Sequence, residues 1–219
     1  MKPSILISLC FSGVALGAVS GFDISHYQGT PYDFDGAYSA GARFVLIKAT
    51  EGTTYTDPAF SSHYGGATDA GLIRGAYHFA QLDSSSGTAQ AQFFLKNGGD
   101  WSGDGITLPG MLDLEGDCAL SASATVSWIQ DFSDTYHAST GRYPLLYTNP
   151  SWWQSCTGDS SAFVDTNPLV LARYSSSAGT PPGGWPYYTI WQFNDSYGYG
   201  GDSDTFNGDE SGLQKLASG

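Results

Sequence analysis

Short apolar runs recur along this chain and alternate, over much of its length, with segments of helical periodicity. Seven runs have the length and β-branched or aromatic content of buried strands. They are Phe22–Tyr27, Phe44–Ala49, Ile73–Phe79, Gly110–Leu114, Pro144–Thr148, Leu169–Tyr174 and Tyr188–Phe193. Three intervening stretches predict helices, at Asp57–Ala70, Thr88–Asn97 and Ala122–Ser139. In the third, apolar residues from Val126 to Tyr136 keep the three- and four-residue spacing of an amphipathic helix.

Capping residues support these helices. Thr88 has the character of an N-cap, and Gly98 and Gly141 stand where their helices would end. Toward the C-terminus the intervals between strands shorten and fill with Gly, Pro and Ser, which leaves little room for helices. Alternating β and α elements predict parallel strands, in either a doubly wound sheet or a barrel. No repeat or Pro-rich linker marks a second domain.

Polar residues gather where the predicted strands end. In strand order they are Asp23 and His26, Lys48 and Glu51, Tyr77 and His78, Asp113 and Glu115, Tyr147 and Asn149, Arg173, and Trp191 with Gln192. The loops that follow parallel strands converge at one end of a barrel, and barrel active sites lie there. A series across seven strands therefore predicts one shared catalytic pocket.

Asp113-Leu114-Glu115 is the part of this series with the clearest chemistry. Strand residues alternate faces, so the two carboxyls share one face and Leu114 takes the other. Like charges that close resist ionising together, which raises one pKa and suits that carboxyl to general acid catalysis. The alternative is that both groups are merely solvated in a loop. The polar series on the other strands favours the catalytic interpretation.

The first twenty residues predict a secretory signal peptide. Lys2 supplies the positive start, residues 5–16 are largely apolar, and Ala18-Val19-Ser20 resembles a cleavage site. Cleavage after Ser20, or a few residues earlier, would leave a catalytic domain spanning 21–219. The sequence thus predicts a secreted, extracellular protein. No second apolar run approaches the ~20 residues of a membrane helix, so no membrane partner is expected.

Secretion changes the meaning of the cysteines. Cys10 lies in the signal segment, and Cys118 and Cys156 remain as an even pair, which predicts a disulfide in an oxidising compartment. The alternative, a zinc site, is disfavoured because two cysteines without nearby histidines make an incomplete shell. We expect no metal and no cofactor.

Charge and aromatic content limit the partners. A net charge of −13 argues against nucleic acid as a partner, because its phosphates require a basic footprint on the protein. Aromatic residues make up 15% of the chain, which weakly favours an uncharged or sugar-like ligand. Nothing in the sequence indicates an oligomer, so a monomer is expected.

Blocks of residues in order along the chain resemble glycoside hydrolase family 25, the Chalaropsis-type lysozymes. They are Phe22–Ser25, Phe44–Gly52, Gly75–Ala80, Leu112–Glu115, Leu146–Asn149 with Trp152-Trp153, Trp191–Phe193 and Gly200–Gly208. Each block is modest alone, but their order over nearly all of the chain after the signal is specific. The resemblance implies an irregular (β/α)5(β)3 barrel and hydrolysis of the β-1,4 bond between N-acetylmuramic acid and N-acetylglucosamine in bacterial peptidoglycan.

Residue roles follow from the same resemblance. Glu115 matches the proton donor, Asp113 its partner, and Asp23 and Asp204 two further carboxylates of the site. The positions implied to contact substrate are Tyr77, Tyr147 and Gln192, with Glu51 and Trp191 as further candidates. Asp113 would assist either as a nucleophile or by orienting the substrate's own 2-acetamido group, and the resemblance favours the second route.

Two other functions remain open from the sequence. A chitinase-like barrel also acts on N-acetylated sugars, but its D-x-x-D-x-D-x-E pattern needs acids where this chain has Leu108 and Met111. A non-catalytic barrel that only binds cell walls would not require four acids in the site. A Glu115→Gln variant separates enzyme from binding protein.

Overall fold

The computed structural model describes residues 17–219, so the predicted signal segment up to residue 16 lies outside the described residues. Eight strands close into a barrel in the order β1-β9-β8-β7-β6-β5-β4-β2, with β2 paired back to β1. The barrel strands are β1 (Val19–Ile24), β2 (Phe44–Glu51), β4 (Ile73–Phe79), β5 (Met111–Leu114), β6 (Leu145–Thr148), β7 (Leu169–Ala172), β8 (Ile190–Asn194) and β9 (Asp202–Phe206). A short β3 (Tyr55–Thr56) extends β2.

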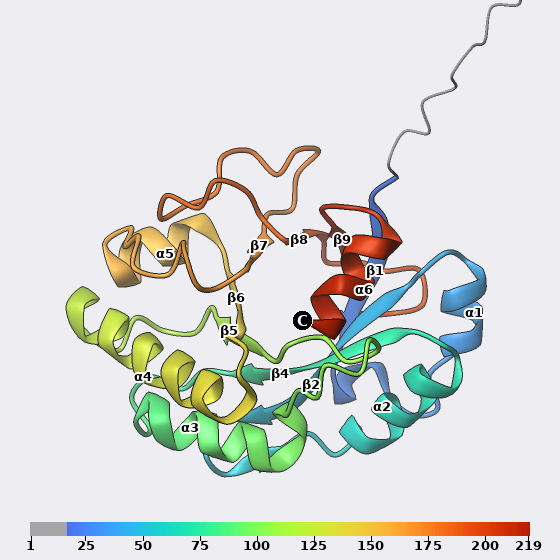
Figure 1. The fold of residues 1–219 in the computed structure, drawn as a ribbon, viewed down its shortest axis with the longest axis horizontal. Helices are drawn as coiled ribbons and strands as arrows, with labels where there is room; N and C mark the ends of the chain where they lie inside the picture. The colour runs from blue at the N-terminus through green and yellow to red at the C-terminus, as the bar shows by residue number, and fades with distance from the viewer. Residues whose placement is uncertain (1–16) are drawn as a thin grey trace, which may run out of the picture.

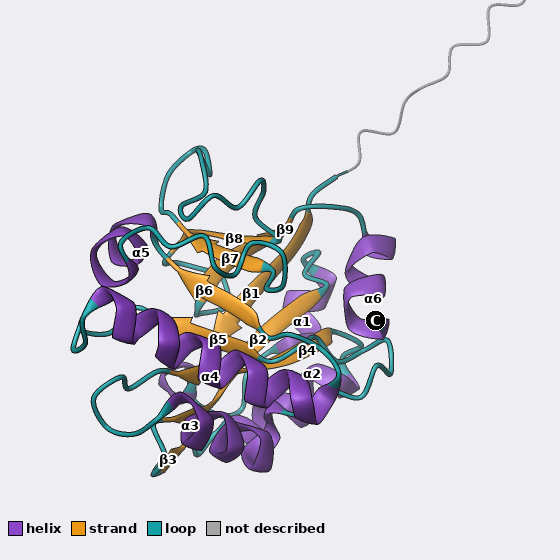
Figure 2. Ribbon diagram, turned by 60° about the vertical axis from the view of Figure 1, so that its left-hand side comes forward, coloured by secondary structure: helices purple, strands orange, loops and turns teal. Residues whose placement is uncertain are grey.

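Seven barrel strands run parallel, and β9 alone is antiparallel to both of its neighbours. The helices are α1 (Phe34–Ser39), α2 (Phe60–Asp69), α3 (Gly87–Phe94), α4 (Ala122–Thr140), α5 (Pro150–Thr157) and α6 (Glu210–Ser218). A 3-10 turn, η1 (His26–Gln28), follows β1, and a π-helical turn, η2 (Leu95–Gly99), extends α3. Helices follow the first five barrel strands and are missing between β7, β8 and β9, as Figures 1 and 2 show. The predicted (β/α)5(β)3 barrel is confirmed.

The start of α3 differs from the prediction. Its N-cap is Ser86, whose hydroxyl accepts a hydrogen bond from the Ala89 N–H at 3.2 Å, and Thr88 lies inside the helix. The reason is Gly87, where a Cβ would collide with the carbonyl oxygen of Trp128. The helix can therefore begin at Gly87 in close contact with α4. Gly141, by contrast, ends α4 in the left-handed conformation at φ 73°, as predicted.

The barrel separates two kinds of core. Inside it, alternate residues such as Phe44, Leu46 and Val170 pack together, and Leu213 and Leu216 of α6 join them. Outside it, a second cluster fills the space beneath α3, α4 and α5, and a third lies under α1 and α2. This alternation of inward and outward residues positions the polar side chains at the top of the barrel.

The loop between β7 and β8 covers the outer face of β7, where a helix would otherwise pack. Trp185, in the loop between β7 and β8, packs edge-on against Trp153 of α5 with ring centroids 4.9 Å apart. Its indole N–H donates to the Asn167 carbonyl oxygen at 2.9 Å. The outer face of β7 is therefore buried without a crossover helix, which explains how a short Gly- and Pro-rich interval suffices.

Covalent and terminal features complete the frame. The predicted disulfide is confirmed: Cys118 and Cys156, with Cα atoms 5.1 Å apart, join the loop after β5 to α5. Val19 and Ser20, which precede the predicted cleavage point, form the start of β1 opposite Phe206 and Thr205 of β9. Among residues 17–219, no helix is both long and apolar enough to cross a membrane.

Candidate active site

A cavity of about 160 Å³ opens at the carboxyl ends of the parallel strands. Its lining is Asp23, Tyr77, Met111, Asp113, Glu115, Tyr147, Tyr174, Gln192 and Asp202. Six of these nine residues belong to the polar series predicted from the strand ends. The structure thus brings these six residues of the polar series together in one cavity, as predicted.

Asp113 lies in β5 and Glu115 in the loop that follows it, and both line this cavity. Met111 and Asp113 face the barrel interior, whereas Leu112 and Leu114 pack in the outer core. Asp113 is 5% exposed, and its buried Oδ1 has no hydrogen-bond partner among the described residues. Glu115 lies beyond the strand end and is exposed at the mouth. The Tyr147 hydroxyl lies 3.5 Å from Glu115 Oε2, a long contact beside the shorter bond through which the same hydroxyl donates its proton to Gln192.

Gln192 joins four side chains of the cavity wall through hydrogen bonds. Its Oε1 accepts hydrogen bonds from the hydroxyls of Tyr147 at 2.8 Å and Tyr174 at 3.1 Å. Its Nε2 donates to Asp23 Oδ2 at 2.7 Å and to Asp202 Oδ2 at 3.2 Å. One buried amide therefore fixes two phenols and two carboxyls, using both donors and both acceptor positions.

The carboxyls in the cavity hold their protons unusually well. Burial, with the Asp202 charge as the next contribution, raises the pKa of Asp23 to about 7. Burial, followed by the charges of Glu115 and Asp23, raises the pKa of Asp113 well above its ordinary value. Partial burial of the Glu115 carboxyl at the mouth, followed by the Asp202 charge, likewise raises the pKa of Glu115. The surroundings of the cavity thus favour the protonated form of all three carboxyls.

This arrangement suits acid-catalysed cleavage of a polar polymer. The cavity continues on one side into a cleft of about 290 Å³ lined by Asn149, Ala172 and Tyr174 among others. A separate cleft of about 280 Å³ lies on the other side, between the loops after β4 and β5. A chain longer than one sugar could therefore cross the mouth past Glu115.

Comparison with known proteins identifies the family. Residues 22–202 match the glycosyl hydrolases family 25. The chain belongs to this family. It is 63% identical to an N,O-diacetylmuramidase of Chalaropsis sp over 211 residues, a match that covers 92% of this chain and all of that protein.

Solved structures agree with this assignment. A muramidase from Trichobolus zukalii superposes with a TM-score of 0.90 at 64% identity, covering 92% of this chain and 99% of that one. A family GH25 lysozyme from Aspergillus fumigatus gives a TM-score of 0.91 at 56% identity, covering 93% and 100%. The protein is therefore an enzyme, a glycoside hydrolase.

In this family 25 hydrolase, Asp204 lies deeper than the cavity. It stands opposite Gly21 of β1 and is 1% exposed, and neither carboxyl oxygen has a hydrogen-bond partner among the described residues. Burial, then the charges of Asp23 and Asp202, raises the pKa of Asp204 well above its ordinary value. Asp202, two residues earlier on the same strand face, lines the cavity instead.

Two other candidate contacts lie outside the lining of the hydrolase cavity. Glu51 is held by Lys48 Nζ at 2.7 Å and by Gln81 Nε2 at 2.8 Å, so both of its oxygens have partners at the rim. Trp191, like Tyr188, packs against the outer core, on the side of the barrel wall away from the cavity. Its indole N–H donates to the Arg173 carbonyl. Gln192, its neighbour in β8, takes the inward position because strand residues alternate.

The polar residues His26 and His78 also have structural partners. His26 Nδ1 lies 2.9 Å from Asp57 Oδ2, beside η1. His78 lies between Thr50 and Gln90 on the outer side of β4, and burial lowers its pKa to about 4. It is therefore neutral at physiological pH and lies away from the cavity.

Sequence reasoning missed Tyr174, Asp202 and Met111. Tyr174 could have been found from β7, because it follows the inward residues Val170 and Ala172 at the two-residue step of a strand. Asp202 lies in the same glycine-rich block as Asp204. The pattern there fixes which face they share but not how far each lies from the mouth.

Proposed function

We propose that this hydrolase cleaves the β-1,4 bond between N-acetylmuramic acid and N-acetylglucosamine in bacterial peptidoglycan. The observation that carries the proposal is the pairing of a buried Asp113 with a Glu115 exposed at the mouth, in a cavity flanked by further clefts. The proteins named above as muramidase, N,O-diacetylmuramidase and lysozyme support the same bond specificity.

Glu115 is the proposed proton donor. A glycosidic bond breaks through an oxocarbenium-like transition state once the leaving oxygen receives a proton. Glu115 reaches the cavity from its rim, and its raised pKa favours the protonated form that a general acid requires. The Tyr147 hydroxyl and the Asp202 charge oppose each other in setting that pKa, since the hydrogen bond lowers it.

Asp113 is proposed to act through the substrate's own acetamide. At 5% exposure its carboxyl lies behind Glu115, which restricts direct approach of an anomeric carbon to its oxygens. A 2-acetamido group can extend deeper than the sugar ring and reach the cavity floor. The cation formed when the acetamide oxygen closes on the anomeric carbon favours the ionised form of Asp113, against the effect of burial. Water then opens the intermediate with retention, and Glu115 takes back a proton.

Gln192, Asp23, Tyr77 and Tyr147 are proposed to hold the sugar beside the two acids. All four line the cavity, and the Gln192 hydrogen bonds keep Asp23 and Tyr147 in fixed positions before substrate arrives. Asp204 is proposed as a carboxyl that supports Asp23 from below rather than as a group that touches sugar.

The protein is proposed to be secreted and to act as a monomer outside the cell. Val19 is 5% exposed and pairs with Phe206 in the barrel. We therefore infer that signal cleavage falls before Val19, a few residues upstream of Ser20. N-terminal sequencing of the secreted protein tests this, and a mature start at Gly21 would contradict it.

The decisive experiment identifies the reducing ends released from purified peptidoglycan. After borohydride reduction, mass spectrometry should find muramitol ends with the wild type and none with Glu115→Gln. Glucosaminitol ends would show a hydrolase of the opposite bond specificity. Release of ends from chitin oligomers alone would favour the chitinase-like alternative. Sedimentation with walls but no new ends would indicate a binding protein.

A further inference from the structure

Two adjoining cavities lie at the base of the barrel, at the end opposite the catalytic carboxyls. The first, about 190 Å³, is lined by the segments 164–169 and 185–189, which lead into the amino ends of β7 and β8. The second, about 300 Å³, lies between residues 187–189, the end of β9 and α6. Tyr187 and Thr189 line both cavities, so the two form one groove, here called the base groove.

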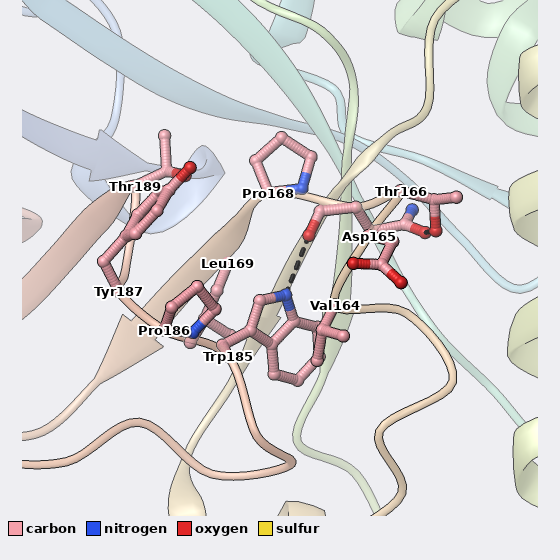
Figure 3. Close-up of a pocket in the computed structure, with 10 residues that line it drawn as sticks. Val164, Asp165, Thr166, Pro168, Leu169, Trp185, Pro186, Tyr187 and Thr189 are labelled. Carbon is pink, nitrogen blue, oxygen red and sulfur yellow. Dashed lines mark hydrogen bonds between the residues drawn. The ribbon is translucent and has the colours of Figure 1, made fainter.

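The first cavity has the make-up of a sugar site. Figure 3 shows Tyr187 and Thr189 on one side of it, Asp165 and Thr166 on the other, and Pro186, Leu169 and Trp185 between them. Trp185 is 5% exposed and held by its hydrogen bond to Asn167, so the apolar floor is rigid. An apolar floor with a few polar groups at its rim is typical of sites for small polar molecules.

Tyr187 is the exposed ridge of this groove. Its side chain is 65% exposed, although the ring is large and apolar, and it stands between the two cavities. Nothing in the packing of the described residues requires a tyrosine there, because Trp185 already fills the core beneath. A flat ring with a free face can stack on the apolar face of a pyranose.

The second cavity adds positive charge. Arg142 and Lys215 both line it, and neither forms an ion pair with a carboxylate anywhere in residues 17–219. Lys96 and Arg173 also lack a carboxylate partner within residues 17–219, but neither lines the base groove, so what distinguishes this cavity is that two such cations line it together. Two unpaired cations at one cavity favour an anionic substituent on the bound chain.

The geometry points to a second, non-catalytic binding site for a glycan chain with anionic substituents, in which Tyr187 stacks on a sugar and Arg142 and Lys215 bind the negative groups. The ligand class rests on the proposed function, since a wall polymer carries both features. Bound there, the enzyme would stay on an insoluble polymer between catalytic events at the opposite end of the barrel.

The test compares binding to intact walls with turnover on soluble fragments. In a Glu115→Gln background, which keeps the polymer intact, Tyr187→Ala should weaken sedimentation with purified walls about 5-fold, the equivalent of one stacking contact. Arg142→Gln with Lys215→Gln should weaken it further and reduce its salt dependence. Tyr38→Ala with Lys96→Gln is the matched control, because Tyr38 is 39% exposed and neither residue lines the base groove.

Two further experiments identify the negative group that Arg142 and Lys215 bind, and separate this proposal from the proposed catalytic function. If the charge effect of Arg142 and Lys215 disappears on walls stripped of phosphate polymers, phosphate is the anion; if it persists, the carboxylates of the peptidoglycan are. With Glu115 intact, the base-groove variants should cleave soluble glycan fragments at the wild-type rate and insoluble walls more slowly. Unchanged wall binding, or an equal loss in the control, would overturn the base groove. Failure of the wild type on soluble fragments would instead overturn the proposed function.

Discussion

Gln192 Nε2 and Asp23 Oδ2 are 2.7 Å apart, the shortest of the hydrogen bonds that Gln192 makes across the barrel mouth. The amide is 2% exposed, and its other contacts reach Tyr147, Tyr174 and Asp202. A neutral donor placed there lets two crowded carboxyls point into the same cavity. The mouth is thus organised before any substrate binds.

Replacing this amide by a carboxyl should destabilise the protein in a pH-dependent way. Gln192→Glu keeps the shape but sets a third acid between Asp23 and Asp202, in a buried place. The pKa of the introduced group would be raised by burial and by both neighbours, so its cost should grow as pH rises above its unfolded value. We expect a loss of about 2–4 kcal/mol at pH 8 and little at pH 4. Thermal unfolding across that range measures it, and a pH-independent loss would contradict the argument.

Asp23→Asn should stabilise the protein at alkaline pH. The pKa of Asp23 is raised to about 7 from an ordinary value of 3.8. The stability linked to this group is therefore fully present below pH 4 and is lost as pH rises through 7. Removing the ionisable group should gain up to about 4 kcal/mol at pH 8 and little at pH 4. Urea unfolding at the two pH values tests this. Asp33→Asn is the control: it changes an exposed N-cap, and it should alter stability little at either pH because Asn caps a helix about as well as Asp.

Glu115→Gln should abolish turnover and leave the fold intact. Without a proton donor the leaving oxygen departs unprotonated, which costs about 10²–10⁴-fold in rate. The release of reducing ends measures the loss, and the unfolding temperature should not fall because Glu115 is exposed at the mouth. Retention of a tenth or more of the activity would remove Glu115 from the role of proton donor.

Lys48→Met should move the alkaline limb of the pH–rate profile upward. The Lys48 charge lowers the pKa of both Asp113 and Glu115, and the Lys48 side chain is 12% exposed beside Glu51. Removing that charge should let the proton donor hold its proton to higher pH. The pH dependence of kcat/KM reports the shift in the free enzyme. Lys96→Met, distant from the cavity, should leave the profile unchanged, and a parallel shift there would refute the electrostatic cause.

Loss of the disulfide should reduce both stability and activity. The bridge closes a loop of 38 residues, which the chain-entropy treatment values at about 4 kcal/mol. Cys118 lies three residues after Glu115, so Cys118→Ser with Cys156→Ser also frees the loop that carries this proposed proton donor. We expect a lower unfolding midpoint in urea and a lower kcat. Reduction of the wild type with dithiothreitol should reproduce both effects, and a change in stability alone would show that the loop does not depend on the bridge.

Much of the fold could be predicted from local patterns. Apolar runs of the right length predicted seven of the eight barrel strands, and the 3.6-residue period predicted α4 nearly to its ends. The missed elements are those whose stability comes from packing. The helices α1, α5 and α6 are short, and β9 has the polar sequence Asp202–Phe206 that only pairing with β1 and β8 makes a strand.

The site shows the same division. Side chains alternate between the two faces of a strand, and the parallel strands end at the same rim of the barrel. Asp23, Asp113 and Glu115 could therefore be predicted to line one site. The depth of each side chain along the barrel axis could not be predicted, because it depends on the stagger between neighbouring strands. That stagger puts Asp202 in the cavity and Asp204 below it, and the same alternation turns Trp191 outward and Gln192 inward.

The sequence by itself determined the alternation of strands and helices, the carboxyls at the strand ends and the even cysteine pair, since each depends on residue type and order along the chain. Those patterns left a doubly wound sheet and a barrel both open, and the resemblance to glycoside hydrolase family 25 favoured the barrel. Only the tertiary structure decided the Gln192 hydrogen bonds, the place of Tyr174 and the base groove. Those features join residues that are far apart in the chain, and closing the barrel fixes how its strands are staggered. The distances between such residues are therefore a property of the closed sheet, which no single segment of the sequence contains.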